Sequence, residues 1–293
     1  MTPIHIRFLR YSAFYSPLLL MIGAGHLKAE GLEATCDVTG PGRPIPDGIR
    51  DGTVQVAQSA LAVSFAPALA GQALPFVHFA MLNSRDGFFL AGRRPDPIFS
   101  WKKLEGKTVL VDHFFQPLAM FKDALRRQGV DAAKVRIVDA GEPAAIEAAF
   151  RRGEGDFVHM QGPPPQQLEA EGLAQVLTAV GATVGPICFS TLAAAPAFLA
   201  TPAAPAVLRA LQAARRQAQQ DDPAAIAAAI TSLLPGVPLP TLATTVADYQ
   251  RLGCWSGAEE ITPALYDETV ALFQRSGGLA GKPDPKGILG KVG

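Results

Sequence analysis

Cysteine is scarce in this sequence. The three cysteines among 293 residues are Cys36, Cys188 and Cys254, and their wide spacing matches no zinc or redox motif. An odd number cannot be fully paired, so we expect small, buried hydrophobic side chains and no disulfide framework. We expect neither a metal site nor a cofactor.

An excess of either charge is also missing. The chain has 26 basic and 26 acidic residues, only 18% of its residues are charged, and it has no Lys/Arg run. Proteins that bind nucleic acid or anionic membrane surfaces use basic patches, so both partners are excluded. The partner that we expect is a small molecule, and we expect the chain to be a monomer. Its length suffices for two domains with a well-buried core.

No apolar run is long enough for a membrane span of ~20 residues. The run at 17–22 is soon interrupted by Gly23, Gly25 and Lys28. The N-terminus does not resemble a signal peptide, because no cleavage-site pattern follows this short run. The compartment therefore stays open: periplasmic if an export signal was removed, cytoplasmic if this chain is the full translation product.

Catalytic motifs are absent as well. The sequence contains no Gly-x-Ser-x-Gly motif and no Walker-type glycine loop. His113 and His159 follow or end two neighbouring predicted strands, so they could meet as acid and base or as metal ligands. The alternative is that they are ordinary ligand contacts. We assign no catalytic residue, and an enzyme remains the second hypothesis.

A strand, a short polar and aromatic turn, and a helix open the chain, and the same order recurs at its middle. The first copy has a strand at 4–10, a turn at 11–16 and a helix at 17–29, and the second has them at 107–111, 112–116 and 117–128. Both helices begin at proline, which suits the first helical position, and end near glycine. Two such units predict two α/β lobes with a ligand site beyond the carboxyl ends of the strands.

The remaining pattern divides the chain into two lobes. Strands alternate with helices of 10–15 residues from about Trp101 to Leu177, which predicts a mainly parallel sheet. Pro95-Asp96-Pro97 and the segment 187–192 are the predicted crossings. We therefore expect a first lobe of residues 1–92 plus 187–293, which carries the C-terminal helices, and a second lobe of residues 93–186.

Polar and aromatic side chains gather at the predicted strand ends, and Arg43 in a glycine-rich loop is the best candidate for a cation in the cleft. The candidate ligand contacts are Tyr11, Ser12, Phe14, Tyr15, Arg43, Gln58, Ser59, Asp112, His113, Phe114, Phe115, Gln116, His159 and Gln161. Segments that converge on one cleft can supply orienting polar groups and apolar walls. The alternative is that these aromatic rings close the cores of the lobes. We expect Tyr15 and Phe115, at equivalent places in the two copies, to hold a flat ligand between them.

Several motifs resemble those of the NMT1/THI5-like family of solute-binding proteins, which includes the nitrate, sulfonate, taurine and thiamine-pyrimidine binders of ABC importers. Gly25-His26-Leu27-Lys28-Ala29-Glu30-Gly31-Leu32 resembles the family pattern G-x-x-x-x-E-G-L. The segment Leu104-Glu105-Gly106-Lys107-Thr108-Val109 is similar to its entry into the second lobe, and Gly153-Glu154-Gly155-Asp156 is similar to a later segment.

The resemblance implies a type II periplasmic-binding-protein fold, in which two α/β lobes joined by two hinge crossings close on a ligand. It implies a protein that captures a small organic molecule, planar, heterocyclic or carboxylated, and an ABC transporter permease as a partner. The alternative is an enzyme on the same scaffold, similar to pyrimidine-precursor synthases or to a desulfinase, that uses cleft histidines.

Overall fold

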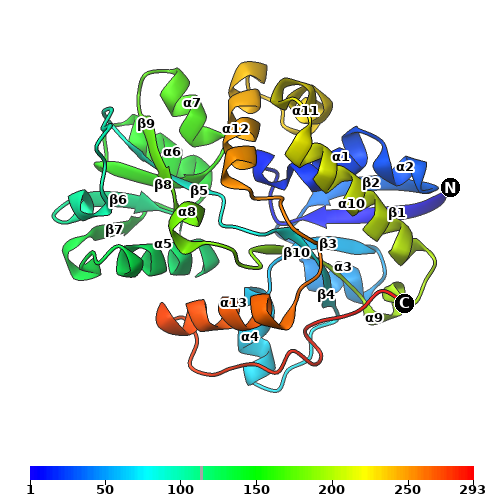
Figure 1. Ribbon diagram of the computed structural model, residues 1–293. Helices are drawn as coiled ribbons and strands as arrows, with labels where there is room; N and C mark the ends of the chain where they lie inside the picture. Colours follow the sequence, from blue (N-terminus) through cyan, green and yellow to red (C-terminus); the bar gives the residue numbers. More distant parts are fainter. Residues whose placement is uncertain (113–114) are drawn as a thin grey trace.

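Two lobes, each built on a β-sheet covered by helices, lie side by side (Figure 1). The computed structural model describes residues 1–112 and 115–293. His113 and Phe114, both candidate site residues, lie outside the described residues. The α/β architecture with two lobes and two crossings that the sequence predicts is present.

The chain builds most of the first lobe, then the second, and then returns. The first part consists of β1 (Thr2–Phe8), η1 (Ala13–Tyr15), α1 (Ser16–Gly23), α2 (His26–Ala29), β2 (Leu32–Val38), α3 (Ile45–Arg50), β3 (Val56–Ser59), α4 (Ala62–Leu69) and β4 (Val77–Asn83). The second part consists of β5 (Phe88–Gly92), η2 (Trp101–Leu104), β6 (Thr108–Val111), α5 (Phe115–Arg127), η3 (Ala132–Lys134), β7 (Arg136–Asp139), α6 (Pro143–Arg151), β8 (Phe157–Gln161), α7 (Pro164–Ala170), β9 (Gln175–Ala179) and α8 (Val180–Val184). The last part consists of β10 (Ser190–Ala194), α9 (Pro196–Leu199), α10 (Ala203–Gln220), α11 (Pro223–Ile230), η4 (Thr231–Leu233), α12 (Leu239–Leu252) and α13 (Pro263–Arg275).

The two sheets repeat one topology. Their strand orders are β2-β1-β3-β10-β4 and β7-β6-β8-β5-β9. In each sheet the first three strands are parallel, and the fourth strand runs antiparallel to both of its neighbours. The fourth strand in each case is the one that arrives from the other lobe. The carboxyl ends of the parallel strands therefore point toward the junction of the lobes, where a ligand site is expected.

The predicted first helix is split into α1 and α2. Gly25 has φ +78°, a left-handed conformation that glycine adopts without strain, and it interrupts the helical path. Helix α1 begins at Ser16 with proline in its first turn, as its sequence suggests. The split leaves the turn before the helix, residues 11–15, where the sequence places it.

The first crossing lies earlier than predicted. Strand β5 pairs with β8 and β9 of the second sheet, so the chain leaves the first lobe between Asn83 and Phe88, not at Pro95-Asp96-Pro97. The boundary at residue 92 is therefore a wrong prediction. Strands β4 and β5 are both continuous in buried apolar residues, and such a pattern does not tell which sheet a strand joins. The second crossing, before β10, lies at the predicted place.

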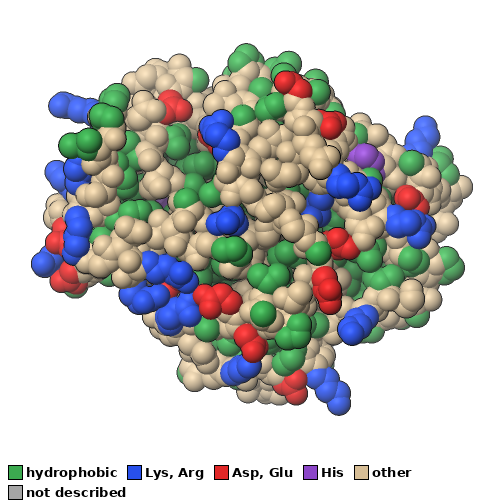
Figure 2. Space-filling model, in the orientation of Figure 1, with side chains coloured by type: hydrophobic (Ala, Val, Ile, Leu, Met, Phe, Trp, Pro, Cys, Tyr) green, Lys and Arg blue, Asp and Glu red, His purple; other side chains and the backbone are tan. Residues whose placement is uncertain are grey.

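The C-terminal helices contact both lobes, not the first lobe alone. Helix α10 packs on α1 and α2, but α12 also contacts α7, and α13 also contacts α5 (Figure 1). Ion pairs join α5 and α13, with 3.2 Å between Arg127 and Glu268 and 3.3 Å between Arg275 and Asp123. Figure 2 shows basic and acidic side chains together over this contact. Among the described residues no helix is long and apolar enough to cross a bilayer.

The first crossing contains a buried carboxyl group. Asp86 is fully buried, and its Oδ1 accepts a hydrogen bond of 2.7 Å from the Phe88 N–H, but its Oδ2 has no partner in the part of the chain that the structure describes. Burial raises the pKa of Asp86 to about 8. The unfolded carboxyl loses its proton near pH 4, whereas the folded one keeps it up to about pH 8, so stability should fall as pH rises through that window.

We expect Asp86→Asn to remove this pH dependence. The amide keeps the acceptor for the Phe88 N–H and cannot ionise, so the variant should be more stable than the parent at pH 8 by about 2 kcal/mol or more. At pH 5 the difference should be smaller. Urea denaturation between pH 4 and 9 measures it, with Asp267→Asn at an exposed position as the control. Parallel pH profiles for parent and Asp86→Asn would contradict the assignment.

Candidate functional site

A cavity of about 320 Å³ lies between the lobes, and we call it the cleft cavity. Its walls come from the segments after β1 and β3, the start of α5, the end of β8 and the second crossing. The candidate contacts that line it are Tyr15, Gln58, Ser59, Phe115, Gln116 and Gln161. These residues come from both sequence copies and from both lobes. The structure thus brings together six of the residues that the sequence singles out.

Tyr15 forms part of the polar wall of the cleft cavity. Its side chain is only 4% exposed, and its hydroxyl accepts a hydrogen bond of 3.4 Å from Gln161 Nε2. Burial raises the pKa of Tyr15, so the hydroxyl stays protonated. Gln58 is fixed nearby, because its Oε1 accepts a hydrogen bond of 2.9 Å from the Leu9 N–H. These hydrogen bonds fix the orientation of the polar side chains on this wall.

Two amide oxygens at the cavity have no hydrogen-bond partner among the described residues. Gln116 donates through Nε2 to the Phe189 carbonyl at 2.6 Å, which fixes the amide orientation and leaves Oε1 without a donor. Gln161 Oε1 is also without a donor. Both side chains are 7% exposed. A buried acceptor without a donor costs about 1–3 kcal/mol, so these oxygens favour a ligand that brings N–H or O–H groups.

Aromatic rings supply the apolar walls. Phe88 and Phe189 are almost fully buried, whereas Phe115 is 49% exposed and stacks on Phe273 at 4.9 Å between ring centroids. Val63, on the other lobe, is 43% exposed and also lines the cavity. Exposed apolar side chains from both lobes therefore line this cavity. That Tyr15 and Phe115 hold a flat ligand between them stays a prediction.

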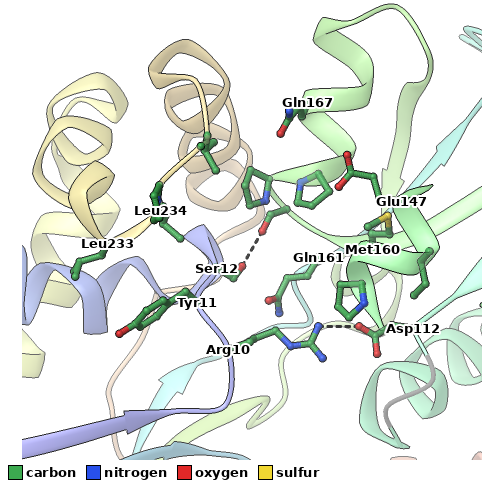
Figure 3. Close-up of a pocket in the computed structure, with 18 residues that line it drawn as sticks. Arg10, Tyr11, Ser12, Asp112, Glu147, Met160, Gln161, Gln167, Leu233 and Leu234 are labelled. Carbon is green, nitrogen blue, oxygen red and sulfur yellow. Dashed lines mark hydrogen bonds and ion pairs between the residues drawn. The ribbon is translucent and has the colours of Figure 1, made fainter. Parts of the chain in front are cut away.

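Arg10 and Asp112 link the lobes beside the cleft cavity. Arg10 Nη1 lies 2.8 Å from Asp112 Oδ2, and the two side chains come from the segments after β1 and β6 (Figure 3). The Asp112 side chain is 3% exposed. Arg10 lines the cleft cavity and also a second cavity of about 490 Å³. The second cavity lies between the Leu233–Val237 segment of the first lobe and the starts of α6 and α7.

Tyr11 and Ser12 line this second cavity and not the cleft cavity. The Ser12 hydroxyl donates to the Gly162 carbonyl at 2.7 Å and so joins the two lobes (Figure 3). The Tyr11 hydroxyl lies 3.3 Å from Cys36 Sγ, within its own lobe. Asp112 also lines the second cavity, and Gln161 lines both.

Three candidate contacts lie away from both cavities, which corrects their placement. Phe14 is fully buried against Tyr249 and Phe189, with ring centroids at 5.2 and 5.3 Å, so it closes a core. Arg43 has a side chain that is 60% exposed and lies 3.6 Å from Asp37. Arg43 itself lines neither cavity, although Thr39, at the start of the same loop, lines the cleft cavity and donates a hydrogen bond of 3.1 Å to the Arg43 carbonyl.

His159 is the third of these residues. It is fully buried between Phe88 and Phe121, at 4.8 and 5.0 Å between ring centroids. Neither ring nitrogen has a hydrogen-bond partner within residues 1–112 and 115–293. Burial lowers the pKa of His159 to about 4, so the ring is neutral at pH 7. The predicted acid–base or metal pair with His113 stays a prediction, because His113 lies outside the described residues. The described residues contain no group of three or more side chains that could hold a metal ion.

Four lining residues are not among the contacts predicted from sequence: Arg10, Phe88, Phe189 and Ser190. Arg10 sits within the predicted first strand, where an arginine suggests only a solvated strand end. Phe88 and Phe189 belong to apolar runs whose contact with a cavity depends on the crossings. Only Ser190 had a usable signal, because it is a polar residue within a predicted crossing. Cleft residues on crossing segments are therefore the ones that local pattern does not find.

Comparison with known proteins shows the family of this chain and confirms its fold. The sequence model of the family described as "NMT1/THI5 like" matches residues 15–225. "Putative binding protein YtlA" of Bacillus subtilis (strain 168) is 25% identical over 201 residues. That alignment covers 68% of this chain and 60% of the relative, so the chain spans less than two thirds of that protein.

Solved structures share the fold over nearly the whole chain. The periplasmic aliphatic sulphonate binding protein SsuA from Escherichia coli superposes with a TM-score of 0.76 at 16% identity, covering 100% of this chain and 93% of SsuA. The desulfurization enzyme DSZB superposes with a TM-score of 0.66 at 14% identity, covering 99% and 97%. These likenesses confirm the predicted periplasmic-binding-protein fold.

We expect Phe14→Ala and Phe115→Ala to differ in stability, because Phe14 lies in the core and Phe115 lines the cleft cavity. Loss of a fully buried ring costs about 3–5 kcal/mol, so Phe14→Ala should be severely destabilised. Phe115→Ala removes a half-exposed ring and should lower the free energy of unfolding by about 1 kcal/mol. Urea denaturation of the two variants measures both values. Equal losses would show that Phe115 is a core residue like Phe14.

Proposed function

Because the chain belongs to the NMT1/THI5-like family, we propose that it is a solute-binding protein that captures a small organic molecule between its lobes. The ligand is planar, heterocyclic or carboxylated, and the recipient is the permease of an ABC importer. One observation supports this most directly: the cleft cavity takes its lining from both lobes and combines aromatic walls with amide and hydroxyl groups. Small-molecule sites have this composition.

The ligand-binding residues that we propose are those of the cleft cavity. Tyr15, Gln58 and Ser59 contribute from the first lobe, and Phe115, Gln116 and Gln161 from the second. A ligand that contacts both groups has its full set of contacts only when the lobes are together. It therefore stabilises the closed arrangement by population shift.

An enzyme on this scaffold is the weaker proposal. Its support is the fold shared with the desulfurization enzyme DSZB, and fold does not fix function. Chemistry needs a base or nucleophile that reaches the ligand, and His159 is neutral and lies off both cavities. Recovery of the bound compound chemically unaltered supports binding, whereas its conversion to a product supports the enzyme.

The proposal predicts a recoverable ligand and a ligand-driven contraction. Native mass spectrometry of the protein purified from its own cells should show a bound small organic molecule. Phe115→Ala should bind that compound at least about tenfold more weakly, because ring stacking and apolar burial are lost. X-ray scattering of the unfolded-and-refolded, ligand-free protein should show a smaller radius of gyration once the compound is restored.

An unchanged radius at saturation would contradict closure. Equal affinity of the parent protein and Phe115→Ala would place the ligand outside the cleft cavity. The exposed variant Leu173→Ala, far from the cavity lining in the α7–β9 connection, is the control and should bind like the parent.

A further inference from the structure

Arg10 carries the positive charge with which a negatively charged ligand would have to pair. Among the described residues that line the cleft cavity and the second cavity, it has the one cationic side chain. It reaches both cavities, so a ligand in either lies close to it. An arginine in such a position is the usual means of holding a carboxylate or sulfonate.

Asp112 already forms an ion pair with Arg10. Its Oδ2 lies 2.8 Å from Arg10 Nη1, and its side chain is 3% exposed, so water screens its charge little. Among the described residues that line the two cavities, the pair therefore leaves no net positive charge. Glu147 lines the second cavity and adds a further carboxylate, 2.7 Å from Arg151, which is not part of the lining.

The two unpartnered amide oxygens make an independent observation. Gln116 Oε1 and Gln161 Oε1 are buried at the cleft cavity, and the Gln116 amide is held in its orientation by its hydrogen bond to the Phe189 carbonyl. Each oxygen presents partial negative charge and can be satisfied only by a donor. A carboxylate or sulfonate has no donor to offer and would meet these oxygens with its own negative charge.

We infer that the cleft selects an uncharged, flat ligand with N–H donors, and that Asp112 is the specificity-determining residue that rejects small organic anions. The inference rests on the proposed function and narrows its ligand class by excluding carboxylated compounds. It separates this chain from SsuA of Escherichia coli, which shares its fold and is an aliphatic sulphonate binding protein. Asp112 acts through Arg10, by cancelling the charge that an anion needs.

Benzamide and benzoate test the inference, because they share one ring and differ in charge and in N–H donors. Isothermal titration should show that the parent protein binds benzamide at least tenfold more tightly than benzoate. Asp112→Asn keeps the side-chain shape and removes the negative charge beside Arg10. It should bind benzoate at least tenfold more tightly than the parent does, with affinity for benzamide changed less than threefold.

The double variant Arg10→Gln/Asp112→Asn is the matched control, and it should lose the gain in benzoate affinity. If Asp112→Asn does not fold, Asp112→Ser removes the same charge and carries the same expectation. A gain in benzoate binding by the single variant supports the inference even where benzamide binds too weakly to measure. Equal binding of the two probes by the parent, or no gain in the variant, overturns it.

The proposed function is decided separately. Ligand-driven contraction with the co-purified compound tests whether the protein is a binding protein at all. If contraction occurs and Asp112→Asn gains no benzoate affinity, the charge inference fails and the binding function stands. If no contraction occurs and the gain is seen, the cleft has the inferred selectivity but does not close on a solute.

Discussion

The contact of the two lobes at Gly162 determines where the cleft can be. Gly162 accepts a hydrogen bond from the Ser12 hydroxyl of the first lobe, and its N–H donates to the Tyr249 hydroxyl of α12 at 2.8 Å. A Cβ at this position would lie 2.7 Å from Thr245 and 2.9 Å from the Tyr249 hydroxyl, so only glycine permits such an approach. Gln161, the preceding residue, is thereby fixed against both cavities.

The same junction is held by groups that are far apart in sequence. The Tyr249 hydroxyl donates to the Gly87 carbonyl at 3.1 Å, next to the first crossing. The Phe14 carbonyl accepts from Asn83 Nδ2 at 2.7 Å and from Trp255 Nε1 at 2.9 Å. Helices α12 and α13 contact both lobes, so they limit how far the lobes separate. The Arg10–Asp112 ion pair lies at this packed junction, between the segments after β1 and β6.

Burial decides the chemistry of the ionisable groups around this junction. It keeps His159 neutral and holds the proton on Asp86 at neutral pH, because a charged form would lose its hydration. Arg10 and Asp112 remain at the surface of the cavities and face each other. The cleft thus offers a paired charge and unsatisfied amide oxygens, which suits recognition by hydrogen bonds.

Hydrophobic periodicity, prolines and glycines are local signals, so the amino-acid sequence alone predicts the duplicated strand–turn–helix order and the alternation of strands and helices in the second lobe. It also placed Gln58, Ser59, Gln116 and Gln161 at strand ends, where parallel strands meet the cleft. Packing in three dimensions puts β5 into the second sheet and Phe14 into the core, while its neighbour Tyr15 reaches the cavity. It also brings Arg10 to a carboxylate 102 positions away. These contacts depend on which surfaces pack together. A local sequence pattern does not indicate which residues distant in the chain will be in contact.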